Sequence, residues 1–465
     1  MPLRAGVPED SQSGYESFEG LDPAEWVPRG YAVINIDARG AGDSEGDIRW
    51  WGSSEGRDGH DAIEELARLP WSNGKIGMAG NSWLAMSQYF VAAEQPRHLA
   101  AIAPLEGASD PYREDSFRGG IPGAVFARFI AGILPGRKQQ EDWAAMIEST
   151  STTNDYFEDK RVDFSKIKVP AYIGGSYSTD VHTLVVHSTQ EWYDLYSPQR
   201  TADLASYFDR YLKSVPNDWS TTPPVRLALL NYTKSAIVDI PFPDLPWHLP
   251  SAQSRTLHLA PDLTLSPTQP SQPSTLTWQA DSSEALSFTY TFPVRTALVG
   301  PSTLTVDISS PSHDDMDVYC HIFKYSLSGI ELSNLNIPLP PGLSEEDADK
   351  ATQNRVWRYW GPNGQLRASQ RHVSASKSTK TWSTLSHEKV EKARPGEVVR
   401  LDVQMWPTGI VFEAGEQLVL KISGEKIGIA ALPHLPKAAN ENRGEHVIHL
   451  GGGKHSSLKF FTVDV

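Results

Sequence analysis

Hydrophobic residues follow two alternating patterns in the first half of the chain. Continuous apolar runs of strand length are separated by segments in which apolar residues recur every three or four positions, as on one face of a helix. Strands that alternate with amphipathic helices predict a parallel α/β sheet. The expected strands are residues 31–37, 76–79, 99–105, 170–175 and 184–187, and the expected helices run from Glu55 to Leu69, from Trp83 to Ala93 and from Leu204 to Leu212.

Residues from about 111 to 165 interrupt this alternation. The segment is Gly-rich at first and then amphipathic around 126–133 and 143–147. We expect an insertion between two strands that forms a helical cap over the sheet. The first domain would then span residues 1–215, with the cap at about 111–165.

From about Pro223 onward, short runs with β-branched residues in alternating positions replace the helical periodicity. Turn residues separate the runs, which is typical of a β-sandwich or jelly roll. We therefore expect a second domain over residues 223–465. The clearest runs are 255–259, 304–308, 318–323, 398–403, 417–422 and 446–450.

The candidate chemistry lies where the run 76–79 meets the next helix. Gly80-Asn81-Ser82 follows the strand directly, and the helical pattern begins at Trp83. A strand, a sharp turn, a serine and a helix form the context of a nucleophile elbow, in which the helix N-terminus offers N–H groups to a developing oxyanion. The alternative is an ordinary helix-capping serine.

A second glycine-rich turn, residues 39–46, follows the run 31–37. A dinucleotide site requires a helix that opens directly from the glycines. Here residues 47–54 intervene before the helical pattern begins near Glu55. We therefore expect no cofactor, and an oxidoreductase ranks well behind a hydrolase.

Charge and cysteine content narrow the functional classes. A formal net charge of −15 disfavours nucleic acid and anionic membranes as partners. The single cysteine, Cys320, cannot form an internal disulfide, and no Cys/His spacing typical of a metal site occurs. No apolar leader segment is visible near the N-terminus, so we expect a soluble cytoplasmic protein.

Short motifs with fixed spacing are spread over the first domain. They are Gly30-Tyr31-Ala32-Val33; Asp37-x-Arg39-Gly40 with Ser44-x-Gly46; Asp58-x-x-Asp61; Trp71-x-x-Gly74-Lys75-Ile76-Gly77-Met78; Gly80-x-Ser82-Trp83-x-Ala85-x-x-Gln88; and Phe208-Asp209-Arg210-Tyr211-Leu212-Lys213. Together they resemble the serine hydrolases of the cocaine-esterase and Xaa-Pro dipeptidyl-peptidase type, over nearly the whole chain. In this family the residue two positions after the serine is commonly not glycine, which accommodates Leu84.

The resemblance implies an α/β-hydrolase domain with a helical cap, followed by a C-terminal jelly roll. It also implies hydrolysis of a small ester, amide or short peptide through an acyl-enzyme. It does not separate esterase, peptidase and acyl-transferase chemistry.

The resemblance assigns roles to four residues, together with the chain order of serine, acid and histidine in this fold. Ser82 would be the nucleophile, and the backbone N–H of Trp83 would be one oxyanion donor. Asp180 would be the acid, in the turn after the run 170–175. His187 would be the base at the end of the run 184–187, with His182 as the alternative.

Two features depart from the family pattern. The family begins with several strands, and a loop after one of them supplies a tyrosine hydroxyl to the oxyanion hole; we expect no counterpart in this chain. Only Thr183 separates His182 from the run 184–187, whereas a parallel crossover needs about a dozen residues. Either the runs 170–175 and 184–187 are not neighbouring parallel strands, or the hydrolase half is incomplete.

The alternative function is therefore a catalytically impaired relative that acts as a binding protein. The sequence leaves a homodimer open and predicts no metal site.

Overall fold

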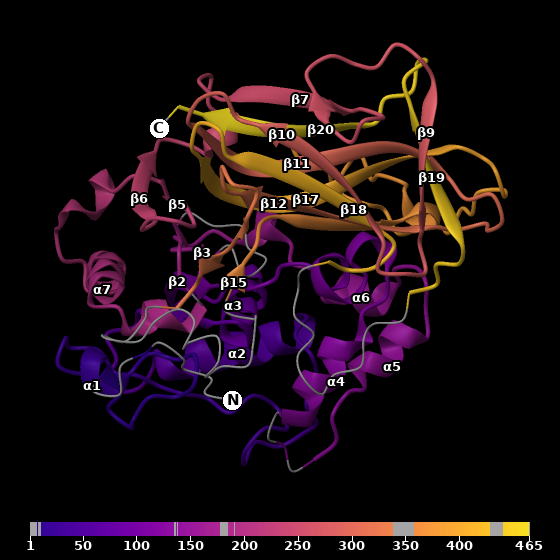
Figure 1. Ribbon diagram of the computed structural model, residues 1–465. Coiled ribbons are helices and arrows are strands. Elements are labelled where there is room, and N and C mark those ends of the chain that lie inside the picture. The colour runs from indigo at the N-terminus through magenta and orange to yellow at the C-terminus, as the bar shows by residue number, and fades with distance from the viewer. Residues whose placement is uncertain are drawn as a thin grey trace.

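The computed structural model describes residues 7, 11–133, 136, 138–176, 185–189, 191–337, 358–427 and 440–464, and the statements below concern these residues. The chain forms two parts that lie against each other (Figure 1). A mixed part of helices and short strands holds the N-terminal half, and a large β part holds the C-terminal half. No helix in the described ranges is long and apolar enough to cross a membrane.

The first part contains a six-stranded sheet in which the strands follow one another in sequence order. The first five strands are parallel and the sixth is antiparallel. The predicted α/β class is thus confirmed. The strands are β1 (Ile76–Asn81), β2 (Leu99–Leu105), β3 (Gly174–Ser176), β4 (Val185–His187), β5 (Val225–Leu229) and β6 (Ile237–Phe242).

Helices cover both faces of this sheet (Figure 1). Neighbouring residues of β2 divide between the two sides, because Ile102 packs in the apolar cluster of one face and Ala103 in that of the other. Burial on both faces is typical of parallel sheets. The first cluster includes α2 (Ser53–Leu66) and α3 (Trp83–Ala93), and the second includes α1 (Pro23–Trp26) and α7 (Pro198–Leu212).

The insertion expected at about 111–165 is helical, and its described residues contribute no strand. Its helices lie beneath the β part (Figure 1). They are α4 (Ala124–Ile133), α5 (Trp143–Glu148) and α6 (Asp155–Asp159), with the short helices η2 (Tyr112–Ser116), η3 (Arg118–Gly120) and η4 (Phe164–Lys166). Short helices outside this segment are η5 (Glu191–Tyr196), η6 (Asp218–Thr221), η7 (Pro246–His248) and η9 (Ala368–Gln370).

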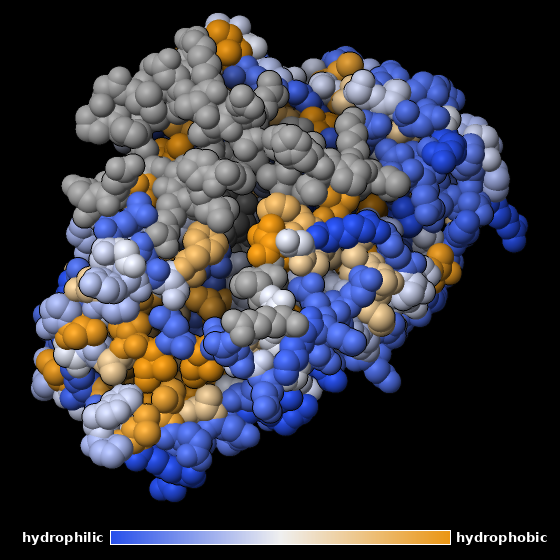
Figure 2. Space-filling model, turned by 90° about the horizontal axis from the view of Figure 1, so that it is seen from below, coloured by the Kyte–Doolittle hydropathy of each residue, from blue (hydrophilic) through white to orange (hydrophobic). Residues whose placement is uncertain are grey.

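The strand predicted over residues 31–37 is wrong. These residues belong to no strand, and the side chains of Ile34 and Ile36 are 41% and 59% exposed. A strand exists only through its hydrogen-bonded neighbour, and β1 is the outermost strand, bordered by β2 alone among the described strands. Figure 2 shows hydrophobic residues gathered on the underside of the molecule.

The structure tests one of the two accounts of the short connection before His187, namely that the runs 170–175 and 184–187 are not neighbouring parallel strands; that account is wrong. β3 and β4 are neighbouring parallel strands, with Ser176 opposite His187. Residues 177–184 alone connect them, so this crossover is shorter than parallel pairs normally require.

The C-terminal part is built from antiparallel strands around one large apolar cluster. All the runs predicted to be strands there are strands, which confirms the β-sandwich class. Cys320 is buried in β12, and burial raises the pKa of its thiol to about 12. The strands are β7 (Gln253–Leu259), β8 (Leu265–Ser266), β9 (Ser274–Gln279), β10 (Ala285–Thr291), β11 (Thr296–Ser309), β12 (Asp317–Tyr325), β13 (Glu331–Leu332), β14 (Asn334–Leu335), β15 (Arg358–Tyr359), β16 (Asn363–Arg367), β17 (Val399–Phe412), β18 (Gln417–Ser423), β19 (Glu445–Leu450) and β20 (Ser457–Val463).

The limit between the two predicted domains stays a prediction. β5 and β6 follow residue 223 in the chain, yet β5 pairs with β4 and β6 pairs with β5, so both continue the first sheet. The two parts are also joined by a direct backbone hydrogen bond, from the Leu230 N–H to the carbonyl of Gly409 at 2.8 Å.

Candidate active site

Ser82 lies at the junction between β1 and α3, as the sequence predicts. Its backbone has φ 55° and ψ −119°, a left-handed conformation that is uncommon for a residue other than glycine. Such strain persists only where the surrounding structure enforces it, and it is concentrated at functional sites. The geometry is that of a nucleophile elbow rather than an ordinary capped helix, because the serine side chain makes no capping hydrogen bond.

Gly80 explains how this elbow accommodates Leu84. The backbone of Gly80 has φ +147°, and a β-carbon added there would lie 2.7 Å from Cβ of Leu84. Glycine at this position therefore makes room for the leucine side chain in the first turn of the helix. Gly80 thus provides space for Leu84, which stands where the nucleophile-elbow motif has a second glycine.

The backbone around Ser82 is fixed on both sides. Its N–H donates to the carbonyl of Leu105 at 3.0 Å, and its carbonyl accepts from the N–H groups of Ala85 and Met86, also at 3.0 Å. The half-buried hydroxyl of Ser82 has no hydrogen-bond partner among the described residues. The N–H of Trp83 likewise has no acceptor in the described ranges, so it is available at the helix N-terminus.

The side chains of Trp50, Trp51 and Trp83 form an indole cluster that anchors α3, the helix that follows the serine. Trp83 Nε1 donates to Glu55 Oε1 at 2.8 Å, and the same oxygen accepts from Ser87 Oγ at 2.6 Å. Burial raises the pKa of the Glu55 carboxyl, while these two hydrogen bonds oppose that rise. The Trp83 ring lies 5.0 Å from those of Trp50 and Trp51, centroid to centroid. The first turn of α3 is therefore held from outside the helix.

His187 ends β4 and is buried next to a carboxylate that the sequence analysis missed. Its Nε2 lies 2.9 Å from Oε1 of Glu106, and the two side chains are 5% and 0% exposed. Its Nδ1 lies 3.1 Å from Oγ1 of Thr189. No hydrogen bond joins His187 to Ser82 within the described part of the chain, so the structure pairs the histidine with an acid but not with the serine.

Asp180 and His182 lie outside the described residues, so their predicted roles stay predictions. Glu106 is the residue immediately after β2. The signal that could have found it in the sequence is an acidic residue directly after a buried apolar run. That run forms β2, the neighbour of the strand β1 that leads to the serine. That position in a parallel sheet points to the edge where the other functional residues lie.

Glu19 is the second carboxylate near the carboxyl ends of the parallel strands. Its carbonyl accepts a hydrogen bond from the N–H of Asn81 at 3.0 Å, which brings the N-terminal segment against the end of β1. Burial, together with the charge of Glu106, raises the pKa of Glu19 to about 7. At neutral pH, Glu19 is thus only partly ionised.

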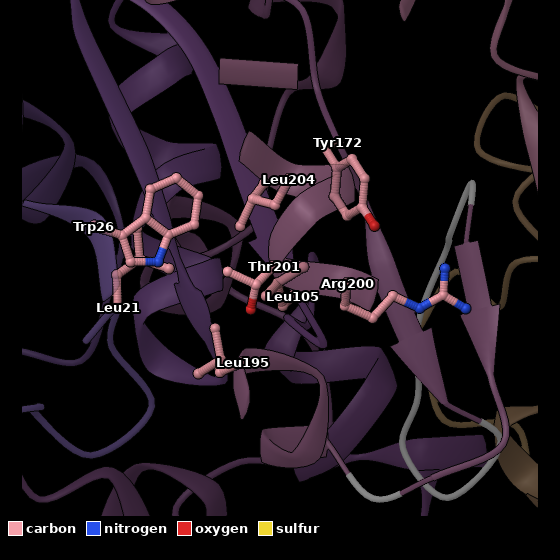
Figure 3. Close-up of a pocket in the computed structure, with 8 residues that line it drawn as sticks. All are labelled: Leu21, Trp26, Leu105, Tyr172, Leu195, Arg200, Thr201 and Leu204. Carbon is pink, nitrogen blue, oxygen red and sulfur yellow. The ribbon is translucent and has the colours of Figure 1, made fainter. Parts of the chain in front are cut away.

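The surroundings contain no metal cluster in the described ranges. No group of three or more His, Cys, Asp or Glu side chains that could hold a metal ion occurs there. A small hollow between α1 and α7 has room for about one water molecule (Figure 3). Its lining is largely apolar, with Trp26 and Leu204 among the residues, and it is too small to receive a substrate.

Comparison with known proteins places this geometry in a family. Residues 9–133 match the model of the X-Pro dipeptidyl-peptidase (S15) family, and residues 217–459 match that of the X-Pro dipeptidyl-peptidase C-terminal non-catalytic domain. The second match covers more than half of the chain. The chain belongs to the X-Pro dipeptidyl-peptidase family.

Relatives with assigned names agree with this membership. The chain is 32% identical to a cocaine esterase of Rhodococcus sp. over 149 residues, which are 30% of this chain and 25% of the esterase. It is 36% identical over 102 residues to a protein of Mycobacterium bovis named as a serine esterase, across 22% of this chain and 16% of that protein. The matches thus span a quarter or less of the length of these relatives.

A solved structure resembles the chain over nearly all of its length. A CocE/NonD family hydrolase from Staphylococcus aureus superposes with a TM-score of 0.88 at 29% identity, covering 99% of this chain and 85% of the hydrolase. The predicted family and the predicted order of an α/β-hydrolase domain followed by a β-rich domain are therefore confirmed.

Proposed function

We propose that this member of the X-Pro dipeptidyl-peptidase family is a serine hydrolase that cleaves a small ester, amide or short peptide through an acyl-enzyme on Ser82. The observation that carries the proposal is the strained backbone of Ser82 between β1 and α3. A helix-capping serine does not require this conformation, whereas a nucleophile that must stand clear of the sheet does.

Each group has a definite part in the proposed reaction. The Ser82 hydroxyl attacks the carbonyl carbon of the substrate while its proton passes to the imidazole of His187. The N–H of Trp83 donates a hydrogen bond to the oxygen that becomes negative. The imidazolium then gives its proton to the leaving group, and water releases the acyl group by the same steps. Asp180 is the acid predicted from the sequence.

A fluorophosphonate probe tests the nucleophile directly, because it reacts covalently with activated serines. We expect one adduct on the wild-type chain, located at Ser82 by peptide mass spectrometry, and none on Ser82→Ala. Ser149→Ala is the matched control, since Ser149 is an exposed serine at the end of α5, and this variant should label like the wild type. An adduct that persists in Ser82→Ala would refute the assignment.

One observation favours the alternative, a catalytically impaired relative that binds a ligand. In the described part of the chain, the Ser82 hydroxyl and the imidazole of His187 are not hydrogen-bonded to each other. A folded sample that does not label at all would support this alternative. The homodimer and the cytoplasmic location stay predictions from the sequence.

A further inference from the structure

Helix α2 carries Glu55 in its first turn and packs closely against α3. A β-carbon added to Gly56 would lie 2.9 Å from the carbonyl oxygen of Phe90 in α3. A β-carbon added to Gly59 would lie 2.3 Å from Cγ2 of Val91. The two glycines therefore allow a close approach of the helices that a larger side chain would prevent. This packing fixes the place of Glu55 relative to the start of α3.

One carboxylate oxygen of Glu55 holds two residues of α3 that lie one turn apart. Oε1 accepts a hydrogen bond from Trp83 Nε1 at 2.8 Å and another from Ser87 Oγ at 2.6 Å. Residues four positions apart lie on the same face of a helix, so a single oxygen can reach both donors. Glu55 thus spans the first turn of α3 from outside that helix.

The indole of Trp83 is held at its ring as well as at its nitrogen. Its ring centroid lies 5.0 Å from those of Trp50 and Trp51, and Trp50 is fully buried. A tryptophan side chain has only two rotatable bonds. Fixing the ring and the nitrogen therefore also restricts the backbone of Trp83.

That backbone is the part of Trp83 that matters for the proposed reaction. Trp83 is the first residue of α3, directly after Ser82, and its N–H has no acceptor in the described ranges. A donor to an oxyanion is effective only when it is already in place before the charge develops. A displacement of about 1 Å in an active site can cost on the order of a hundredfold in rate.

The second oxygen of Glu55 indicates that stability alone does not explain this residue. Oε2 is buried and has no hydrogen-bond partner in the described part of the chain. An unpaired buried acceptor costs about 1–3 kcal/mol. A side chain that only filled space between α2 and α3 would not carry this cost.

We infer that Glu55 is a positioning residue for the oxyanion site: its Oε1 fixes the indole of Trp83, and the indole fixes the backbone N–H of the same residue. The inference rests on the proposed function, in which this N–H stabilises the negative oxygen. Glu55 acts through Trp83 rather than on the substrate itself.

Fluorophosphonate labelling of Ser82 at several probe concentrations tests this role, because the phosphoryl oxygen of the probe takes the place of the oxyanion. The maximal labelling rate constant should fall by about 10–100-fold in Glu55→Leu, while the probe concentration at half-maximal rate stays within about threefold. Trp83→Phe keeps an aromatic ring but lacks the indole N–H, and its maximal rate should fall by about 3–30-fold. The double variant should be no more than about twofold slower than Glu55→Leu, because both changes remove the same contact.

Two further variants separate positioning from stability. Glu55→Gln keeps an oxygen that can accept from the indole, so its maximal rate should stay within about threefold of the wild type. Glu64→Leu is the matched control in the same helix. Glu64 binds the N–H and Nδ1 of His98, at 3.1 and 2.8 Å, in the segment between α3 and β2. Its loss should lower the melting temperature but leave the maximal labelling rate within about threefold of the wild type.

A second measurement reads the contact itself and needs no activity. The indole N–H resonance of Trp83 is observed by NMR on 15N-labelled protein and assigned as the signal that Trp83→Phe removes. A hydrogen bond to a carboxylate moves such a proton downfield. The resonance should therefore move upfield in Glu55→Leu and keep its position in Glu64→Leu.

Four outcomes would contradict the inference or its basis. An unchanged maximal rate in Glu55→Leu would overturn the inference, as would an indole resonance that does not move in this variant. Losses that multiply in the double variant would also overturn it, because the two residues would then act separately. If Glu55→Leu does not fold, an unchanged maximal rate in Trp83→Phe overturns the inference. A wild-type chain that is folded but does not label contradicts the proposed function instead, and with it the role of the N–H that Glu55 positions.

Discussion

Gly80 shows how one backbone position supports the elbow. We expect Gly80→Ala to lower the free energy of unfolding by about 1–3 kcal/mol, because φ +147° is strained for alanine and its β-carbon would meet Leu84. Thermal unfolding measures the effect. Gly132→Ala is the control, since Gly132 lies in α4 with nothing within 4 Å, and it should be stabilising by about 0.5–1 kcal/mol. Equal behaviour of the two variants would contradict the strain at Gly80.

Glu19 provides a prediction with a defined pH dependence. Its pKa is raised to about 7 in the folded protein, so the folded state holds this proton more tightly than the unfolded state. The destabilisation is absent below the ordinary pKa of a carboxyl, grows as the pH rises, and is complete above about pH 7. Glu19→Gln should therefore exceed the wild type in free energy of unfolding by about 1–2 kcal/mol at pH 8 and match it at pH 4.

Urea unfolding at the two pH values measures this difference. Glu45→Gln, which changes an exposed carboxylate in the 39–46 turn, should stay within about 0.5 kcal/mol of the wild type at both. A benefit of Glu19→Gln that is the same at pH 4 and pH 8 would show that the charge of Glu19 is not its cause.

At the scale of elements, a buried lysine joins the helical insertion to the indole cluster. The ammonium of Lys160 donates to the carbonyl of Trp50 and lies 3.3 Å from Glu141 Oε2, with the side chain 5% exposed. Lys160→Met should lower the free energy of unfolding by about 2–4 kcal/mol, because it leaves buried acceptors unpaired. Tryptophan fluorescence during unfolding follows the cluster directly. Lys168→Met, at an exposed lysine nearby, should change stability by less than about 0.5 kcal/mol.

Periodicity predicted most elements because it reports local geometry. The runs 76–79 and 99–105 form strands, and the three-and-four spacing after Ser82 forms α3, since each pattern reflects which face of its own element is buried. The run 31–37 has the same apolar character but no partner strand, and pairing is a property of the sheet rather than of the segment. The sequence could therefore predict the turn at Ser82, but not that β1 is the outermost of the described strands in this sheet.

The pairing of Glu106 with His187 was beyond the sequence for a similar reason. Glu106 follows β2 and His187 ends β4, and β3 separates these two strands in the sheet. The contact between the two residues therefore depends on strand order and register. The spacing of residues along the chain reveals neither the strand order nor the register. The family order of serine, acid and histidine points to the turn after the run 170–175, whereas the contact between Glu106 and His187 arises from the arrangement of the sheet.

At the scale of the whole molecule, Arg118 links the helical insertion to the β part. Its Nη1 donates to Oδ1 of Asn363 at 2.8 Å, its carbonyl accepts from Gln365 Nε2 at 2.9 Å, and its guanidinium lies 4.9 Å from the ring centroid of Trp406. The two parts should therefore unfold together. Arg118→Ala should lower the melting temperature and broaden or split the calorimetric transition, for a loss of about 1–3 kcal/mol.

Arg128→Ala is the matched control for this interface. Arg128 pairs with Glu148 on the surface of the insertion, with both side chains about half exposed, so its loss should change stability by less than about 0.5 kcal/mol. A single transition of unchanged width in Arg118→Ala would show that the contact does not couple the two parts.

The outermost position of β1 has a consequence for measurements in deuterated water. A strand bordered on one side only directs alternate amide groups away from its neighbour, although the N–H of Asn81 is covered by the carbonyl of Glu19. Deuterium uptake along β1 should therefore alternate between slow and fast positions, and the slow ones should extend to the residue just before the serine.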